Sequence, residues 1–76
     1  MTGYEMIDRI NSMARCPVQY RANWLPAAEK QAKAVEVEIA RLRDFAARKP
    51  GTIADVCRRS AEDLSLKLVE AMTKFQ

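Results

Sequence analysis

The sequence predicts a single all-α domain over residues 1–76, in which a short N-terminal helix precedes a long antiparallel, coiled-coil-like helical hairpin. Three observations predict this fold class. The 76 residues include only two glycines and three prolines, which favours helix. Two long stretches each place apolar residues at spacings of 4, 3, 4, 3 and 4, the repeat of a heptad seam. A short link, residues 49–52, joins these stretches, and a link of this length makes consecutive helices antiparallel neighbours.

The N-terminal helix is expected over about residues 3–15. Thr2 followed three positions later by Glu5 is a capping-box pattern, which marks the start of a helix. Pro17 is expected to end this helix, because the residue before a proline avoids the helical region. Residues 17–25 are then expected to form an irregular segment or a short helix.

The two long helices are expected over about residues 26–48 and 52–75. Pro26 suits the first position of a helix, where its missing N–H would be unpaired in any case. In the link, Gly51 is expected to take a positive φ, and Thr52 is expected to cap the second long helix.

The apolar repeats of the two long helices match each other. When the chain folds back at the link, residues whose numbers sum to 103 face one another, and large side chains meet small ones at several levels. The expected pairs are Ala46 with Cys57, Leu42 with Ala61, Ile39 with Leu64, Val35 with Leu68, Ala32 with Ala71, and Ala28 with Phe75.

Several apolar residues remain outside this seam, which predicts a homo-oligomer, a dimer or a tetramer. A chain of this length buries only about 60% of the surface that it exposes when unfolded, so a second subunit would add stability. Leu66 points nearly opposite to Leu64, so burial of both requires cover on two sides of one helix. The expected oligomer interface contains Val37, Phe45, Leu66, Val69 and Met72.

Catalysis and metal binding lack the residues that they need. The chain has no histidine, the commonest general base, and no glycine-rich phosphate loop. Cys16 and Cys57 lack the spacing of a zinc site and cannot form the framework of a disulfide-rich domain. We therefore expect no catalytic residue, no cofactor and no metal, in a protein that is not an enzyme.

Charge and hydropathy patterns predict a cytoplasmic protein without membrane contact. No apolar run approaches the ~20 residues that span a bilayer, and the first residues lack a signal-peptide pattern. The net charge of +3 permits nucleic-acid binding but does not require it. Most acidic residues precede a basic residue by four positions, which is typical of solvated helix surface. These pairs are Glu5–Arg9, Glu29–Lys33, Asp44–Arg48, Asp55–Arg59, Asp63–Lys67 and Glu70–Lys74.

Two groups of residues are candidates for binding a partner. Tyr20, Arg21 and Trp24 lie in the expected irregular segment, and aromatic and arginine side chains dominate binding hot spots. The alternative is that the aromatic residues cover the open end of the helical bundle. The second group lies near the hairpin tip, where an acidic partner or phosphates would be bound, or where the charges only complement helix ends. Its members are Arg48, Lys49, Arg58 and Arg59.

These features predict a small, non-enzymatic regulatory protein that acts by binding another protein of unknown identity. The most concrete form of this hypothesis is a phage or mobile-element antirepressor or inhibitor, which sequesters a regulator or a host protein. One alternative is a small nucleic-acid-binding transcriptional regulator. A second alternative is a structural, self-assembling helical protein that needs no foreign partner.

Overall fold

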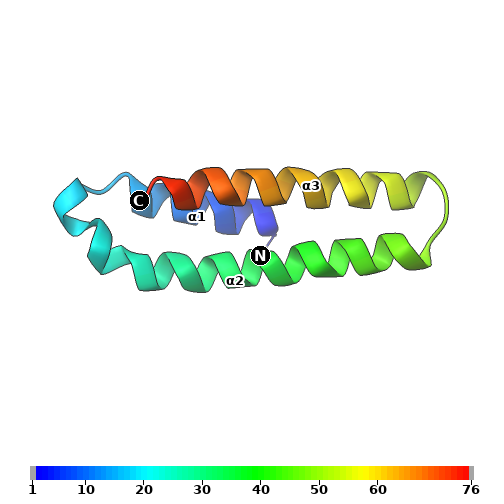
Figure 1. Cartoon of the computed structure of the whole chain (residues 1–76), viewed down its shortest axis with the longest axis horizontal. Helices are drawn as coiled ribbons and strands as arrows, with labels where there is room; N and C mark the ends of the chain where they lie inside the picture. The colour runs from blue at the N-terminus through cyan, green and yellow to red at the C-terminus, as the bar shows by residue number, and fades with distance from the viewer. Residues whose placement is uncertain (1, 76) are drawn as a thin grey trace.

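The computed structural model describes residues 2–75, which form three α-helices and no strand. These are α1 (Gly3–Ala14), α2 (Val18–Arg48) and α3 (Thr52–Thr73) (Figure 1). Helices α2 and α3 lie side by side in opposite directions, and α1 packs against both of them. The molecule is a rod of 48 × 18 × 15 Å. The all-α class predicted from the sequence is confirmed.

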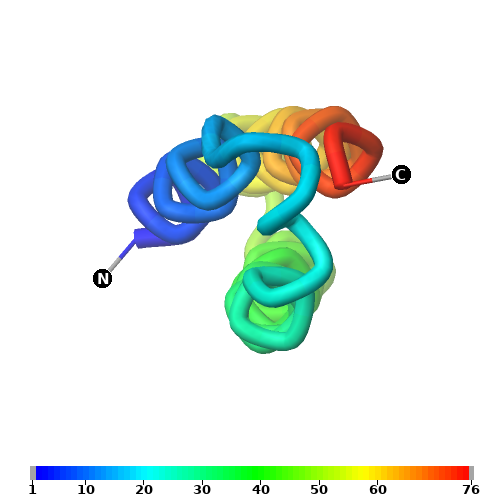
Figure 2. The backbone as a smooth tube through the Cα atoms, turned by 90° about the vertical axis from the view of Figure 1, so that its left-hand side faces the viewer, coloured from blue at the N-terminus to red at the C-terminus, as the bar shows by residue number. Residues whose placement is uncertain are grey.

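The hydrophobic core forms where α1 meets the seam between α2 and α3. Viewed along the rod, the three helices occupy the corners of a triangle (Figure 2). From α1 the core takes Met6, Ile7 and Ile10. The residues from the other helices all belong to the two apolar repeats, so the seam is the one that the sequence predicts. They are Ala28, Ala32, Val35 and Ile39 of α2, and Ala61, Leu64, Leu68 and Ala71 of α3.

Helix α1 runs parallel to α3, and polar links fasten it near both of its ends. At one end the Tyr4 hydroxyl donates a hydrogen bond of 2.7 Å to the Asp63 carboxylate. At the other end Lys74 Nζ donates a hydrogen bond of 2.9 Å to Asn11 Oδ1. These links set the position of α1 along the hairpin.

The helix ends agree with the sequence at two positions and correct it at a third. Thr2 Oγ1 accepts a hydrogen bond of 3.2 Å from the Glu5 N–H, which confirms the predicted cap of α1. Gly51 has a φ of 89°, as expected. The prediction that Thr52 caps α3 is wrong, because Thr52 is already helical and Gly51 is the N-cap, with no side-chain hydrogen bond there. The backbone of Gly51 turns the chain into the helix one residue earlier than expected.

The predicted helix start at Pro26 is also wrong. Residues 18–25 are helical, but they are continuous with the rest of α2, which begins at Val18 and contains Pro26. A proline inside a helix removes one hydrogen bond, here to the Ala22 carbonyl, at a cost of about 3 kcal/mol. Both residues are exposed, so water can reach that carbonyl. The first turns of α2 bend away from the line of the rest (Figure 1).

Candidate protein-binding surfaces

Helix α1 is shorter than the hairpin helices and covers only part of one hairpin face. Its first residue, Gly3, lies against both helices: a Cβ placed there would meet Leu64 Cδ2 at 3.0 Å and Glu38 Cγ at 3.5 Å. From these contacts the hairpin continues to its tip at Gly51 with no third helix among residues 2–75 (Figure 1). The tip half of this face is therefore uncovered.

Heptad spacing identifies the residues on the uncovered part of the face. Residues seven positions apart on a helix lie on the same side, about 10.5 Å apart. Phe45 follows Glu38, which lies against α1, by seven positions. Val56 precedes Asp63, the carboxylate bonded to Tyr4, by seven positions. Phe45 and Val56 therefore continue the face that α1 covers.

Ile53 belongs to the same face, because it precedes Lys67 by fourteen positions and Lys67 Nζ lies 5.0 Å from the centre of the Tyr4 ring. Leu42, one turn before Phe45, is half-buried between this face and the seam. We call Leu42, Phe45, Ile53 and Val56 the tip face. The half-buried Cys57 is the seam residue next to it.

The tip face exposes large apolar side chains that the covered part of the hairpin does not. The exposed fractions are 43% for Phe45, 60% for Ile53 and 56% for Val56. Under α1, core residues such as Ile39 and Leu64 are at least 93% buried. A cluster of exposed apolar side chains that continues an internal interface is typical of a binding surface.

A polar cluster of Tyr4, Asp63 and Lys67 marks the boundary between the covered and uncovered parts. Lys67 Nζ lies 3.3 Å from Asp63 Oδ2, the oxygen that also accepts the Tyr4 hydrogen bond. Hydrogen bonds from Tyr4 and then from Lys67 lower the pKa of the Asp63 carboxyl. The hydrogen bond to Asp63, followed by partial desolvation, raises the pKa of the Tyr4 hydroxyl. Both pKa shifts favour a protonated Tyr4 hydroxyl beside an ionised Asp63 carboxylate.

The basic residues predicted to bind a partner near the tip divide into two groups. Arg48 pairs with Asp44 at 3.0 Å, and Arg58 pairs with Asp55 at 3.2 Å. The expected Asp55–Arg59 pair is therefore replaced by an i, i+3 pair between Asp55 and Arg58. No salt bridge within residues 2–75 engages Lys49 or Arg59, or Arg41 beside them.

These three unpaired cations flank the tip face. Arg41 lies one turn from Phe45, and Arg59 lies one turn from Val56. Lys49 ends α2 seven positions after Leu42. Arg58 instead lines a hollow of about 330 Å³ on the other side of the hairpin.

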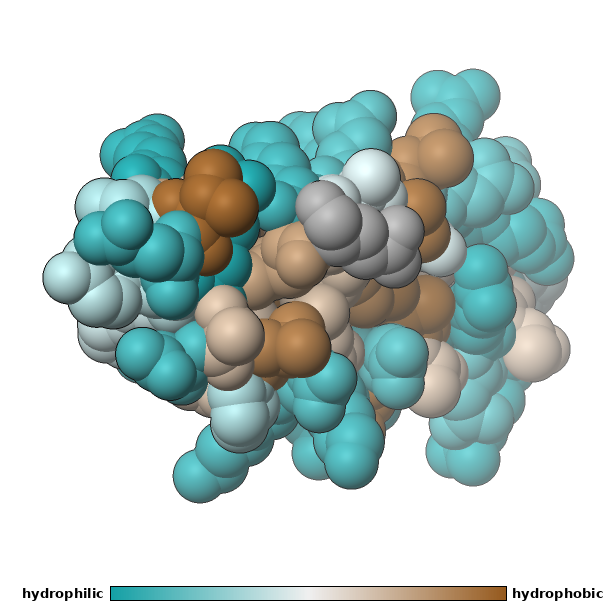
Figure 3. Space-filling view, turned by 60° about the vertical axis from the view of Figure 1, so that its left-hand side comes forward, coloured by the Kyte–Doolittle hydropathy of each residue, from teal (hydrophilic) through white to brown (hydrophobic). Residues whose placement is uncertain are grey.

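The second predicted group lies at the opposite end of the rod. Trp24 lines a hollow of about 570 Å³, whose other lining residues are Arg9, Ser12, Met13, Arg15 and Cys16. Tyr20 and Trp24 are about half exposed, so they cover the end of the core only in part. Arg21 is half-buried, and its Nε has no hydrogen-bond partner among the described residues. At this end, apolar side chains form separate patches among polar ones (Figure 3).

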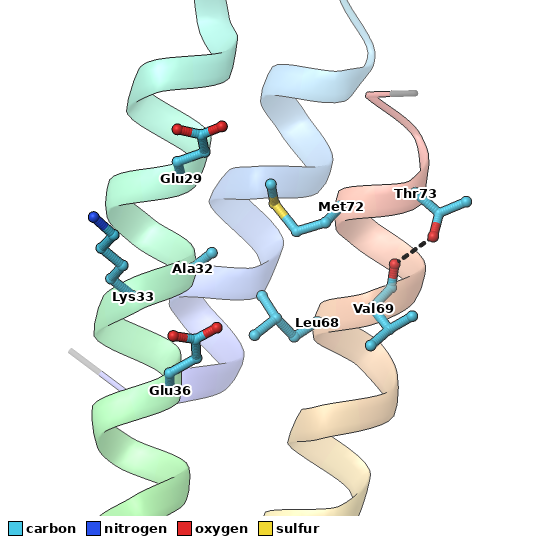
Figure 4. A pocket seen from close by; sticks show the side chains of 8 residues that line it. All are labelled: Glu29, Ala32, Lys33, Glu36, Leu68, Val69, Met72 and Thr73. Carbon is cyan, nitrogen blue, oxygen red and sulfur yellow. Dashed lines mark hydrogen bonds between the residues drawn. The ribbon is translucent and has the colours of Figure 1, made fainter.

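The residues predicted to form one oligomer interface lie on four different sides of the hairpin. Phe45 belongs to the tip face, whereas Val37 and Leu66 are exposed on the outer sides of their helices. Val69 and Met72 line a hollow of about 410 Å³ between α2 and α3. Helix α1 lies behind this hollow (Figure 4), which we call the back groove. Its rim carries both signs of charge, from Glu29, Lys33 and Glu36.

Other classes of site find no support among residues 2–75. No three histidine, cysteine, aspartate or glutamate side chains gather where they could hold a metal ion. No described helix is long and apolar enough to cross a membrane. Comparison with known proteins finds no matching family model, curated protein or solved structure. The class that the fold defines is a three-helix, all-α protein built on a helical hairpin.

Proposed function

We propose that this protein is a non-enzymatic binding protein whose tip face receives a helix of another protein. The observation that carries the proposal is the exposure of Phe45, Ile53 and Val56 on the same hairpin face that α1 packs against. Helix α1 is an internal example of what this face binds, since it lays Ile7 and Ile10 onto the hairpin. Laying an amphipathic helix against an apolar surface is a recurring mode of protein recognition.

The length of the tip face suits a short helix. From Glu38, where α1 begins, to Arg48, where α2 ends, the axis rises by roughly 15 Å. A helix of about three turns covers that length. The bound helix would be masked from its other partners, which is how an inhibitor or antirepressor acts. That specific role stays a prediction from the sequence.

The test compares protein capture by four forms of the full chain in cells of its native source. The tip-face variant is Phe45→Glu/Val56→Glu. The control variant, Val37→Glu/Leu66→Glu, places the same charges on exposed apolar residues outside the face. The end variant, Tyr20→Ala/Trp24→Ala, alters the hollow beside Trp24. We expect a stoichiometric partner that the wild type, control and end variants retain and the tip-face variant loses.

Two outcomes would overturn the proposal. Loss of the partner only in the end variant would move the binding site to the hollow beside Trp24. Binding to DNA with a steep dependence on salt, with no protein partner, would favour the nucleic-acid-binding alternative. Circular dichroism should give the same helix content for every variant, which would show that loss of the partner does not come from unfolding.

A further inference from the structure

We infer that the helix that fits the tip face is acidic, with carboxylates on both flanks of its apolar stripe. This inference rests on the proposed function and specifies its partner. It starts from an imbalance of charge at the tip. Residues 41–59 contain six basic and two acidic side chains, a net charge of +4, whereas the whole chain carries +3.

The paired charges at the tip leave the cations beside the tip face unsatisfied. Both acidic residues of this segment, Asp44 and Asp55, already contact an arginine. Arg41, Lys49 and Arg59 then flank the apolar side chains on the α2 side, at the tip and on the α3 side. A helix across the face would place its own flanks beside these three cations. Carboxylates there would gain complementary contacts, whereas lysines would be repelled.

At the covered part of the face, two lysines of α3 lie beside electron-rich groups of α1, while Tyr4 of α1 donates a hydrogen bond to Asp63 of α3. Lys67 and Lys74 of α3 lie toward α1, where they contact electron-rich groups. Lys67 lies over the Tyr4 ring, and Lys74 donates to the Asn11 carbonyl oxygen. Asp8 of α1 lines the same hollow of about 320 Å³ as both lysines. Acceptors on the bound helix therefore already match cations on the hairpin.

Charge also disfavours a second copy of this chain as the occupant of the tip face. Two tips brought together would oppose the same cations, Arg41, Lys49 and Arg59, across a partly desolvated contact. The back groove differs, because Glu29, Lys33 and Glu36 give its rim both signs of charge. The tip face thus selects a foreign, acidic helix.

The test uses two stapled helical peptides with one apolar stripe, flanked by glutamates in one and by lysines in the other. Fluorescence anisotropy with the full chain measures both dissociation constants. Three exposed ion pairs predict about tenfold tighter binding of the glutamate peptide. The preference should shrink as salt rises from about 0.05 M to about 0.5 M. It should shrink to about twofold in Arg41→Gln/Arg59→Gln, where Lys49 remains, and all binding should be lost in Phe45→Glu/Val56→Glu.

The two cysteines report where the peptide binds. Cys57 adjoins the tip face, whereas Cys16 lines the hollow at the other end. We expect bound glutamate peptide to slow alkylation of Cys57 and to leave that of Cys16 unchanged. An unchanged rate at Cys57, or slower alkylation of Cys16, in the complex than in the free chain would overturn the inference.

The remaining outcomes separate the two proposals. Equal affinity for both peptides, still lost in Phe45→Glu/Val56→Glu, would overturn the acidic partner and leave the proposed function standing. Binding that this variant does not weaken, or no binding of either peptide, would overturn both. Sedimentation showing a dimer that only this variant dissociates would identify a second copy as the occupant and overturn the acidic partner.

Discussion

The two halves of the hairpin differ in what covers them rather than in how they are built. Both belong to the same pair of helices and carry the same heptad repeat. Under α1, hairpin side chains such as Leu64 are buried, whereas Phe45, Ile53 and Val56 on the tip face stay exposed. Full burial of such a side chain contributes about 1.5–3 kcal/mol. The comparison shows that one half of this face is covered by the chain's own helix, whereas the other half exposes its apolar side chains.

The strongest test of this comparison is to truncate one large side chain under α1 and one on the tip face. Leu64→Ala should lower the free energy of unfolding by about 2–5 kcal/mol, because it leaves a cavity in the core. Phe45→Ala should lower it by about half as much, since nearly half of the Phe45 residue stays exposed in the fold. Urea unfolding followed by circular dichroism measures both. Equal losses would mean that the tip face belongs to the core.

A smaller effect is expected where the two halves meet. Gly3→Leu would force a side chain into Leu64, which a Cβ alone would approach to 3.0 Å. Overpacking of this kind costs about 1–3 kcal/mol and should push the start of α1 off the hairpin. Hydrogen exchange at the first turn of α1 should rise, while exchange at the last turns of α1 should change little. Unchanged protection of the first turn would show that Leu64 moves aside instead.

The smallest effect is expected from the polar cluster at the boundary. Tyr4→Phe removes the hydrogen bond to Asp63 and should lower the Tm less than Gly3→Leu does. Because the pKa of Asp63 is lowered in the fold, its contribution is present at neutral pH and is lost as pH falls through that pKa, below its ordinary value of 3.8. The Tm difference between wild type and variant should therefore vanish in acid.

The same pair of proteins tests the alkaline side. The pKa of Tyr4 is raised above its ordinary value of 10.0, so its contribution is present below pH 10 and is lost as pH rises through the raised value. Melting curves recorded from acid to alkaline pH would follow the Tm difference as Asp63 becomes protonated and as Tyr4 becomes ionised. A Tm difference that is independent of pH would show that the ring packing of Tyr4, and not its hydrogen bond, holds this end of α1.

Much of the fold followed from local patterns, and the exceptions have physical reasons. The seam through Ile39 and Leu64 follows from spacing alone, since heptad positions must share one face. A helix start was expected at Pro26 because its missing N–H costs nothing at the first position of a helix. That local pattern does not show that α2 already begins at Val18, eight residues earlier. Asp55 has two arginines within reach, at three and four positions, and helix geometry alone does not choose between them.

The candidate site was harder to predict, because it depends on where α1 lies. Periodicity shows that Phe45 and Leu66 are off the seam, but it does not show that they occupy different sides of the molecule. That distinction needs the contacts of Gly3 and Tyr4 with residues about sixty positions away. One signal was present in the sequence: the first expected helix is about half as long as the others, so it cannot cover the whole hairpin. Ile53 was missed because it falls at a helix start.

The tight turn at Gly51 has a consequence for how the chain reaches its native state. The residues that α2 and α3 bring together near the tip are close in sequence, whereas Tyr4 and Asp63 are separated by 59 positions. Closing a short segment costs less chain entropy than closing a long one. We therefore expect the hairpin to form first, starting from its turn, and α1 to dock last. Folding φ-values, which report how far a residue's contacts are formed in the transition state, should then be higher at Ala46 than at Ile10. A newly made chain would then briefly expose the full length of this hairpin face, until α1 docks and covers half of it.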